Sequence, residues 1–227
     1  TYVDFRDNEK EKHASIMKEL VDQGGLNTYW RTAHDDIWWC NNWVPDLDAL
    51  NVEDLTYVEV NVRKQMLFSH KFLKKNVPGF KNSYIMDTAS QIGTRGSRRL
   101  IGEHVVTWDD VISGIVHEDS IAVLPHLGRQ VSNGFPPVHI PYRALLPRKI
   151  DNLIVAGRCF SSDTAANNAL NWIQQCIPPG QAAGTAAALA VRYGITLREV
   201  DHSVLQNNLV DQGVPLPDQA KKAAAKA

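Results

Sequence analysis

The chain has 227 residues, of which 44% are hydrophobic and 22% charged, and its formal net charge at neutral pH is −1. This length and composition fit one or two globular domains with a real hydrophobic core. The near-zero charge argues against a bulk electrostatic partner, so we expect neither nucleic acid nor an anionic membrane surface to be bound. The apolar stretches are far too short to span a membrane.

The three cysteines are Cys40, Cys159 and Cys176, which are widely spaced and odd in number. Their spacing matches neither a zinc motif nor a disulfide framework, so we expect reduced thiols and a cytoplasmic location. The sequence starts at Thr1 with no initiator methionine and no signal-like stretch, which allows for an upstream segment removed by processing.

In the first third of the chain, residues 7–23 predict an amphipathic helix that Gly24 and Gly25 end. Residues 26–50 are aromatic and irregular, with turn residues near their end. Four tryptophans lie within this stretch: Trp30, Trp38, Trp39 and Trp43. Two interpretations of them stay open, a core or interface cluster and the aromatic wall of a substrate pocket.

The clearest helix is expected to begin at Thr56, with Glu59 completing a capping box, and to end at Asn76 before Pro78. Residues 84–89 and 100–106 alternate enough to predict two strands, joined by the basic stretch IGTRGSRR. The stretch that follows, TWDD, resembles the start of a further helix.

In the last third, residues 128–141 predict a loop rich in glycine and proline, of a kind that is usually functional or a lid. Residues 150–157 predict a buried strand, and residues 180–193 an alanine-rich helix that Gly194 ends. A short helix is expected near residues 203–211, ahead of a tail without a function of its own.

The expected helix start at Gly180 and Gln181 is a candidate ligand site. The first four amides of a helix have no internal partners, and the peptide dipoles leave partial positive charge there. Gly180 lets an electron-rich group approach closely, and Gln181 adds a side-chain amide. The alternative is a close-packed helix with no ligand, because helices rich in glycine and alanine are common in α/β cores.

Two arginine segments are candidates for binding phosphate or carboxylate. Arg158 follows the predicted strand directly, where open α/β sheets place ligands, although an ion pair with Asp151 or Asp163 explains it equally. The stretch GTRGSRR holds three more arginines, Arg95, Arg98 and Arg99. Their forked guanidinium groups suit anions, and a solvated turn is the alternative.

The middle third contains four histidines: His104, His117, His126 and His139. Their spacing matches no metal-binding motif, so no metal site is expected. His126 and His139 flank the Gly/Pro-rich loop and are the better acid/base candidates. Cys159 has no adjacent histidine and is more often a small buried residue than a nucleophile.

Three segments, in order, carry a resemblance to a known family. VPGFKNSYIMDTASQIGTRGSRRLIGEHVVTWDDV, IPYRALLPRKIDNLIVAGRCFSSD and GQAAGTAAALAVRYG are similar to the C-terminal part of FAD-dependent oxidoreductases. These are grouped loosely with the flavoproteins of the fumarate reductase and succinate dehydrogenase class. The similarity runs from about residue 52 to residue 213. The family usually has an arginine near Asn171 and a tyrosine near His104, and these departures bear on the substrate more than on the fold.

The resemblance implies FAD as the cofactor and hydride transfer between a small organic substrate and flavin N5. It implies a cofactor-binding set: Gly157, Arg158, Cys159, Gly180, Gln181, Ala182, Ala183, Arg98 and Arg99. The helix start among these residues lies beside the flavin pyrimidine edge in the family. The catalytic candidates are His126, His139 and Tyr142 for moving the substrate proton and Arg95 for holding a carboxylate or oxyanion.

The fold class expected is α/β with an α+β mixture. Residues 1–149 are expected to form a substrate or cap domain, residues 150–213 the C-terminal segment of a Rossmann-like FAD-binding domain, and residues 214–227 a tail. Family members open with a strand, a GxGxxG turn and an acidic residue, and this chain contains no GxGxxG. We therefore expect a second polypeptide, from a split gene or a cleaved precursor, to carry the ADP-binding half.

Two further hypotheses remain open for the function. In one, the chain is a non-catalytic scaffold subunit derived from a flavoprotein, in which the family motifs serve packing alone. In the other, it is an isolated substrate-binding module that relies on the tryptophan-rich first third.

Overall fold

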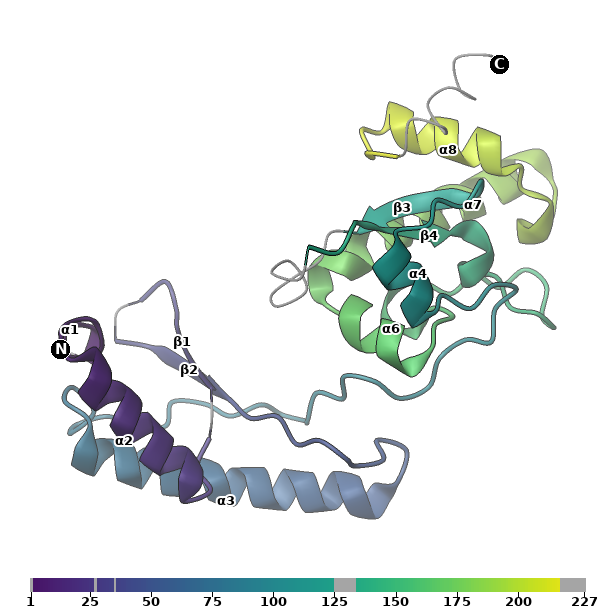
Figure 1. Cartoon of the computed structure of the whole chain (residues 1–227). Helices are drawn as coiled ribbons and strands as arrows, with labels where there is room; N and C mark the ends of the chain where they lie inside the picture. Colours follow the sequence, from purple (N-terminus) through teal and green to yellow (C-terminus); the bar gives the residue numbers. More distant parts are fainter. Residues whose placement is uncertain (1, 27, 35, 125–133, 217–227) are drawn as a thin grey trace. The chain divides into compact units, whose positions relative to one another are not determined.

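The computed structural model describes residues 2–26, 28–34, 36–124 and 134–216. By contacts the chain divides into two compact units, Thr1–Thr94 and Arg95–Ala227. Figure 1 shows the first unit as helices beside a small hairpin and the second as helices around a second small sheet. The mixed helical and sheet composition that the sequence predicts is therefore confirmed.

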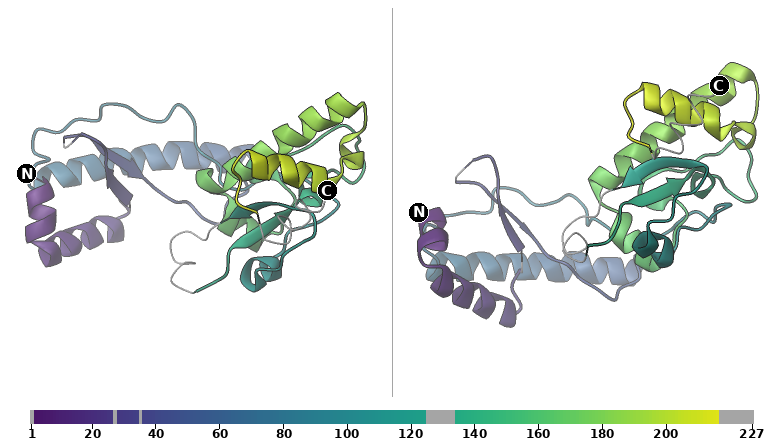
Figure 2. Two further views of the ribbon diagram at one scale, coloured as in Figure 1. Left: turned by 90° about the horizontal axis from the view of Figure 1, so that it is seen from above. Right: turned by 45° about the horizontal axis from the view of Figure 1, so that its top comes forward.

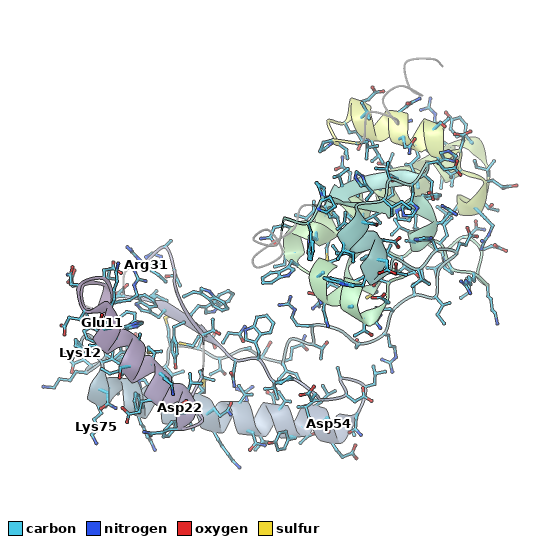
Figure 3. All side chains as sticks on the ribbon, viewed as in Figure 1. Glu11, Lys12, Asp22, Arg31, Asp54 and Lys75 are labelled. Atoms are coloured by element: carbon cyan, nitrogen blue, oxygen red, sulfur yellow. The ribbon has the colours of Figure 1, made fainter. Side chains whose placement is uncertain are left out.

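The first unit contains α1 (Tyr2–Asn8), α2 (Lys10–Asp22) and α3 (Val52–Asn76). The helix expected over residues 7–23 is confirmed for most of its length, although a break at Glu9 separates α1 from α2. Its core is a cluster of six buried residues: Tyr2, Phe5, Leu20, Phe72, Leu73 and Val77. Figure 3 shows charged side chains on the outside of α2 and α3, among them Glu11, Lys12 and Lys75.

Helix α3 ends where the sequence predicts, and its N-cap lies five residues before the predicted cap. Its N-cap is Asn51, whose side-chain oxygen accepts hydrogen bonds from the amides of Glu53 and Asp54. Thr56, the predicted cap, donates its hydroxyl hydrogen to the carbonyl of Val52 inside the helix. Asparagine caps at least as well as threonine, so the earlier start satisfies more amides and extends the helix by a turn.

The aromatic stretch predicted as irregular contains a hairpin of β1 (Thr28–Arg31) and β2 (Trp38–Asn41), paired antiparallel. Only Trp38 joins the core, where its ring meets that of Tyr2 edge-on at 4.4 Å between centroids. Three tryptophans stay largely exposed: Trp30 at 44%, Trp39 at 73% and Trp43 at 43%. The core interpretation therefore holds for Trp38 alone.

The second unit is built around a two-stranded antiparallel sheet of β3 (Ser120–Leu124) and β4 (Val138–Pro141). The helices of this unit follow in chain order: α4 (Trp108–Ser113), η1 (Tyr142–Leu145), η2 (Gly157–Cys159), α6 (Thr164–Leu170), α7 (Ile173–Tyr193), η3 (Leu197–Glu199) and α8 (His202–Asp211). Figure 2 shows α7 and α8 on the same side of the sheet, and both contact β3.

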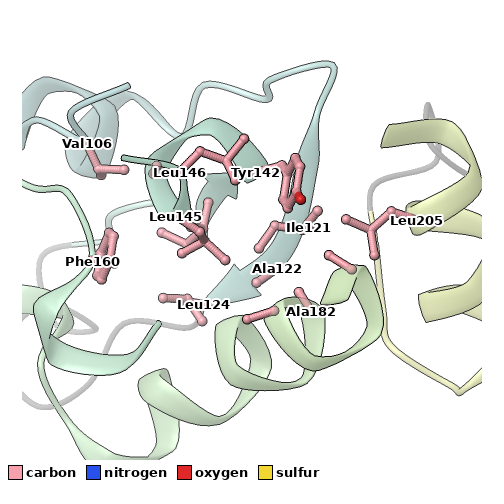
Figure 4. Packing of buried hydrophobic residues seen from close by; sticks show 14 of the residues in the cluster. Val106, Ile121, Ala122, Leu124, Tyr142, Leu145, Leu146, Phe160, Ala182 and Leu205 are labelled. Carbon is pink, nitrogen blue, oxygen red and sulfur yellow. The ribbon is translucent and has the colours of Figure 1, made fainter. Parts of the chain in front are cut away.

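The core of this unit joins the sheet to α7 and α8. Ile121, Ala122 and Leu124 of β3 face Ala182 of α7, and Leu205 of α8 closes the cluster (Figure 4). All five side chains are fully buried. Alanine on α7 lets the helix lie close to the sheet, which agrees with the packing alternative weighed for this helix.

Three strand predictions are wrong, and one loop prediction is wrong at its end. Residues 84–106 form no strand and make only isolated bridges, at Gly102 and Val106. Residues 150–157 form no strand. Asp151 and Asn152 make a bend, with Asn152 at φ 55°, and Val155 donates its amide hydrogen to the carbonyl of Leu145 without joining a sheet. β4 occupies the end of the predicted loop 128–141, of which residues 128–133 lie outside the described residues. A strand needs a neighbour, and local alternation does not supply one.

The helix start in the stretch TWDD is confirmed. The hydroxyl of Thr107 accepts from the amide of Asp110, and the Asp110 carboxylate accepts from the amide of Thr107 at 2.8 Å, so the two residues form a reciprocal capping box. The short helix expected near residues 203–211 is also confirmed as α8, which Asp201 caps.

The start of α7 differs from the prediction. The helix begins at Ile173, so Gly180 lies seven residues inside it, after Pro178 and Pro179. The fixed φ of proline suits a helix, and Trp172 opens this one with its amide hydrogen bonded to the Gln175 side chain at 3.4 Å. The predicted end is confirmed, with Gly194 in the left-handed region at φ 64°.

The domain boundary predicted between residues 149 and 150 stays a prediction. It concerns a domain that a second polypeptide would complete, whereas the two compact units are defined by contacts within this chain alone. No helix within the described ranges has the length and apolar character that a membrane span requires.

Candidate functional site

Arg95 is held at the surface of the second unit by α6 and the start of α7. Its Nε and Nη2 donate to Oδ1 of Asn171 at 3.2 and 2.7 Å, and its guanidinium lies 4.6 Å from the ring centroid of Trp172. The sequence supports this arrangement because Asn171 ends α6 and Trp172 opens α7. Arg95 is therefore oriented by contacts on two sides.

Arg158 brings a second positive charge to the same place. Its backbone carbonyl accepts a hydrogen bond from Nδ2 of Asn167 at 2.9 Å, which fixes η2 against α6. Burial and the neighbouring charge of Arg158 lower the pKa of Arg95 below the ordinary arginine value. Arg95 remains charged at neutral pH, and two like charges in proximity favour binding of an anion between them.

Two buried amides next to these arginines have unused hydrogen-bonding atoms. Asn167 is 1% exposed and Asn171 is 4% exposed. Within the described part of the chain, Oδ1 of Asn167 and Nδ2 of Asn171 have no hydrogen-bond partner. Buried polar atoms are rarely left so, and a polar ligand or water is the usual partner. We call Arg95, Arg158, Asn167 and Asn171 the arginine–amide site.

Glycines leave the surroundings of this site open. Gly157, at φ 79°, adopts a conformation that favours glycine, and no atom lies within 4 Å of where its Cβ would be. At Gly96 an added Cβ would meet Oδ1 of Asn167 at 3.4 Å. The backbone at Gly96 therefore lies close to the Asn167 side chain, whereas the space beside Gly157 is open.

Three further predicted cofactor residues, Arg98, Arg99 and Cys159, are not part of the arginine–amide site. Arg99 donates to the hydroxyl of Thr164 at 2.9 Å, whereas Arg98 is exposed. Cys159 is exposed and carries a free thiol. Burial raises the pKa of the Cys176 thiol, and the charge of Arg158 opposes that rise, so Cys176 also lies within electrostatic reach of the site.

The residues expected at a helix start lie inside α7. Ala182 and Ala183 are buried in the core, and in a continuous helix their amides donate to carbonyls four residues earlier. Gln181 turns its side chain to α8 and donates to Gln212 at 2.9 Å. There it borders an open groove of about 410 Å³ between α7 and α8. The unpaired backbone amides predicted at residues 180–183 are therefore not present in the described structure, because these residues lie inside the helix.

The predicted acid/base residues have different surroundings. Tyr142 is 3% exposed and donates its hydroxyl hydrogen to the carbonyl of Leu197 at 2.7 Å, so this proton serves a structural bond. His139 on β4 is half-buried, and its Nδ1 has no partner among the described residues. Burial and the nearby His117 lower the pKa of His139, which keeps the ring neutral at neutral pH. His126 lies outside the described residues.

Sequence reasoning missed two groups of residues. Asn167 and Asn171 carry no motif, and only their position on α6 opposite the basic stretch reveals them. His104, Asp110 and His117 place one ligand atom each within 4.8 Å of the others. The capping turn before α4 brings the first two together, so the predicted helix start was a usable signal for this cluster.

A sequence model of the family described as FAD dependent oxidoreductase matches residues 3–209. The chain belongs to this family. The match spans both units and implies FAD as the cofactor. No curated protein and no solved structure matches the chain.

The arginine–amide site fits one end of such a cofactor. Two guanidinium groups suit negative charge, and buried amides with an unused acceptor and donor suit a ring that carries both carbonyl and N–H groups. The fit is partial, because the amides of residues 180–183 are enclosed in α7 and the sequence has no GxGxxG for the ADP moiety.

Proposed function

We propose that this chain supplies the flavin and substrate end of an FAD-dependent oxidoreductase that acts on a small organic substrate. When bound, FAD supplies hydride transfer at its N5 atom. Arg95 and Arg158 bind negative charge on the substrate or the flavin, and Asn167 and Asn171 fix the orientation of the bound group. The ADP-binding half comes from polypeptide outside these residues, which makes the active site a shared one.

The arginine–amide site supports this proposal most directly. The oriented guanidinium of Arg95, with the charge of Arg158 nearby, lies next to buried amides with unused atoms, and packing alone does not require this combination. An isolated buried amide group without a partner destabilises a protein by about 1–3 kcal/mol. A ligand that occupies these atoms removes that penalty.

The segment 150–157 supports a shared fold. Its residues 150–153 are exposed, and it has no strand partner in the described residues. Large apolar side chains are exposed on it and on the first turns of α7: Ile150, Leu153, Ile173 and Ile177. Exposed apolar side chains are typical of interfaces, and a partner chain would cover those on each of these two segments.

For the proton that accompanies hydride transfer, we propose His139 rather than Tyr142. A neutral imidazole with an unused ring nitrogen can accept a proton, whereas the Tyr142 hydroxyl is already donated to Leu197. Within the family, we propose a dehydrogenase of the fumarate reductase and succinate dehydrogenase flavoprotein class.

The first experiment is native mass spectrometry of the protein isolated from its source, which we expect to contain a second polypeptide and FAD. In that complex, Arg158→Gln should lower flavin occupancy or raise the substrate KM at least about 10-fold, the worth of one charged contact. Arg192→Gln, on the far end of α7, is the matched control and should leave both unchanged. Equal effects of the two variants would reject the site.

A scaffold without redox chemistry is the second candidate, and the enclosed amides of residues 180–183 favour it. Gln181→Leu separates the two functions, because the Gln181 side chain donates to the exposed Gln212 and its loss should leave folding intact. Loss of flavin from the folded variant supports the enzyme. Unchanged activity and flavin content support the scaffold.

A further inference from the structure

A cluster of two histidines and one aspartate lies at the start of α4, apart from the residues of the arginine–amide site. We propose that His104, Asp110 and His117 bind a divalent transition-metal ion, with zinc as the best fit. This inference does not rest on the proposed redox function.

The separations within the cluster suit one ion. The three ligand atoms lie within 4.8 Å of one another, so a point exists that is at most about 2.8 Å from each of them (4.8 Å divided by √3). Zinc bonds to histidine nitrogen and carboxylate oxygen are about 2.0–2.2 Å long. Shifts of up to about 0.8 Å, within the range of side-chain rotation, therefore complete the site.

The distance between His104 and Asp110 also fits two ligands of one ion. Nε2 of His104 lies 3.3 Å from Oδ2 of Asp110, which is long for a hydrogen bond between these groups. Two ligands of a tetrahedral zinc ion with bonds of 2.0–2.1 Å are separated by about 3.3 Å. The pair already has the spacing of co-ligands.

His117 supplies an independent observation. Its Nε2 is buried and has no hydrogen-bond partner within the described ranges. Its ring lies 4.8 Å from that of His104, centroid to centroid and close to edge-on. A buried imidazole nitrogen that faces another histidine without a proton acceptor is suited to donate its lone pair to a metal.

The backbone holds all three ligands in place. The capping box with Thr107 fixes Asp110, the amide of His104 donates to the carbonyl of Arg143, and Ser120 binds both the amide and the carbonyl of His117. Two imidazoles and a carboxylate prefer zinc or a similar first-row ion, and three protein ligands leave one position for water.

The test uses the full chain, stripped of metal and free of flavin, titrated with Zn²⁺ alone against a chromophoric indicator. We expect one equivalent to bind. His104→Gln and His117→Gln should each weaken binding at least about 10-fold, since even residues that only support a ligand contribute this much. Co²⁺ in place of zinc should give the strong visible absorption of a tetrahedral site.

Two controls match these variants. His202→Gln removes a histidine at the start of α8, and Asp109→Asn changes the exposed neighbour of Asp110, so neither should alter affinity. If a variant fails to fold by circular dichroism, the ring resonances of His104 and His117 in the unmodified protein decide the question. Both must shift on addition of zinc. Absence of stoichiometric binding, or equal weakening by the controls, overturns the proposal.

Discussion

At the scale of single residues, the surroundings of Tyr142 are those of a structural group. Its hydroxyl is buried in the core cluster of the second unit and donates to the carbonyl of Leu197. Burial raises the pKa of this tyrosine above its ordinary value, so the phenol stays protonated. The residue links the end of β4 to η3.

Tyr142→Phe should therefore lower the free energy of unfolding by about 1–2 kcal/mol, because the Leu197 carbonyl loses its donor inside the core. Urea denaturation of the variant measures this loss, and flavin-dependent activity should remain. Tyr193→Phe, which removes an exposed hydroxyl, should have little effect on stability. Lost activity at unchanged stability would restore Tyr142 as a catalytic residue.

Asp201 gives a prediction about pH. The hydrogen bond from the amide of Val204, with a second from Ser203, lowers the pKa of the Asp201 carboxyl. A lowered pKa in the folded state means that the cap stabilises above the unfolded value of about 3.9 and is lost as pH falls through the folded value.

At pH 7, Asp201→Ala should lower the free energy of unfolding by about 1 kcal/mol, the usual contribution of an N-cap. The difference from the unmodified protein should shrink below pH 4 and vanish once the carboxyl is protonated. Urea denaturation at several pH values measures it. Asp211→Ala, at the other end of α8, should show no such dependence, and a pH-independent difference for Asp201→Ala would contradict the capping role.

At the scale of elements, helix α7 continues through two prolines, which weaken its hydrogen bonding just before the residues expected to face the flavin. Its prolines have no N–H groups, so the carbonyls of Gln174 and Gln175 lack their regular helical donors. The residues after the prolines carry the amides that the family resemblance assigns to the flavin. We expect the turns before Gly180 to be the weakest part of this helix.

Pro178→Ala should stabilise α7, because a proline in a helix interior is less favourable than alanine by about 3 kcal/mol. If the flavin needs the amides of residues 180–183, the same change should weaken FAD binding in the complex. Gly184→Ala also stiffens the helix, and no atom obstructs the added Cβ, so it serves as the control with unchanged FAD affinity. Unchanged FAD affinity for Pro178→Ala would mean that these amides stay enclosed.

Two helix ends that local contacts decide were predicted correctly, whereas the equally local Asn51 cap of α3 was missed. Thr107 with Asp110, and Gly194 in its left-handed conformation, act within a few residues of sequence. The strand predicted over residues 100–106 failed because its backbone bonds to a distant segment that forms no strand, as when the amide of Leu100 donates to the carbonyl of Cys159. The start of α7 was placed at Gly180, although the helix begins at Ile173 and contains Pro178 and Pro179, whose φ is compatible with a helix.

The arginines of the candidate site could be predicted from the sequence, whereas its two asparagine side chains could not. Arg95 and Arg158 stand out as arginines near glycines, and the structure brings them within electrostatic reach. Asn167 and Asn171 are ordinary helix residues until the fold buries them. His104 and His117 lack a motif because the turn before α4, rather than a fixed spacing, brings them together.

At the scale of the whole molecule, the two units are joined through a segment without regular structure. Residues 84–101 are mostly exposed, and the contact division falls within them. Such segments are preferred sites for proteases, because cleavage requires an extended backbone. Both units have buried cores of their own.

Brief trypsin digestion should therefore cut after Arg98 before it cuts inside either core and leave two fragments near 98 and 129 residues (227 minus 98). Mass spectrometry identifies the cut, and circular dichroism of the fragments shows whether each keeps its helices. First cleavage within α3 or α7, whose residues are helical, would contradict the division.

Trp172 gives the protein an optical reporter at the arginine–amide site. It is 40% exposed and carries the Arg95 guanidinium against its ring, whereas four of the other five tryptophans belong to the first unit. A bound chromophore that absorbs near 350 nm, as flavins do, would quench its emission by energy transfer. With the remaining tryptophans changed to phenylalanine, the fluorescence of this one indole would follow occupancy of the site in real time.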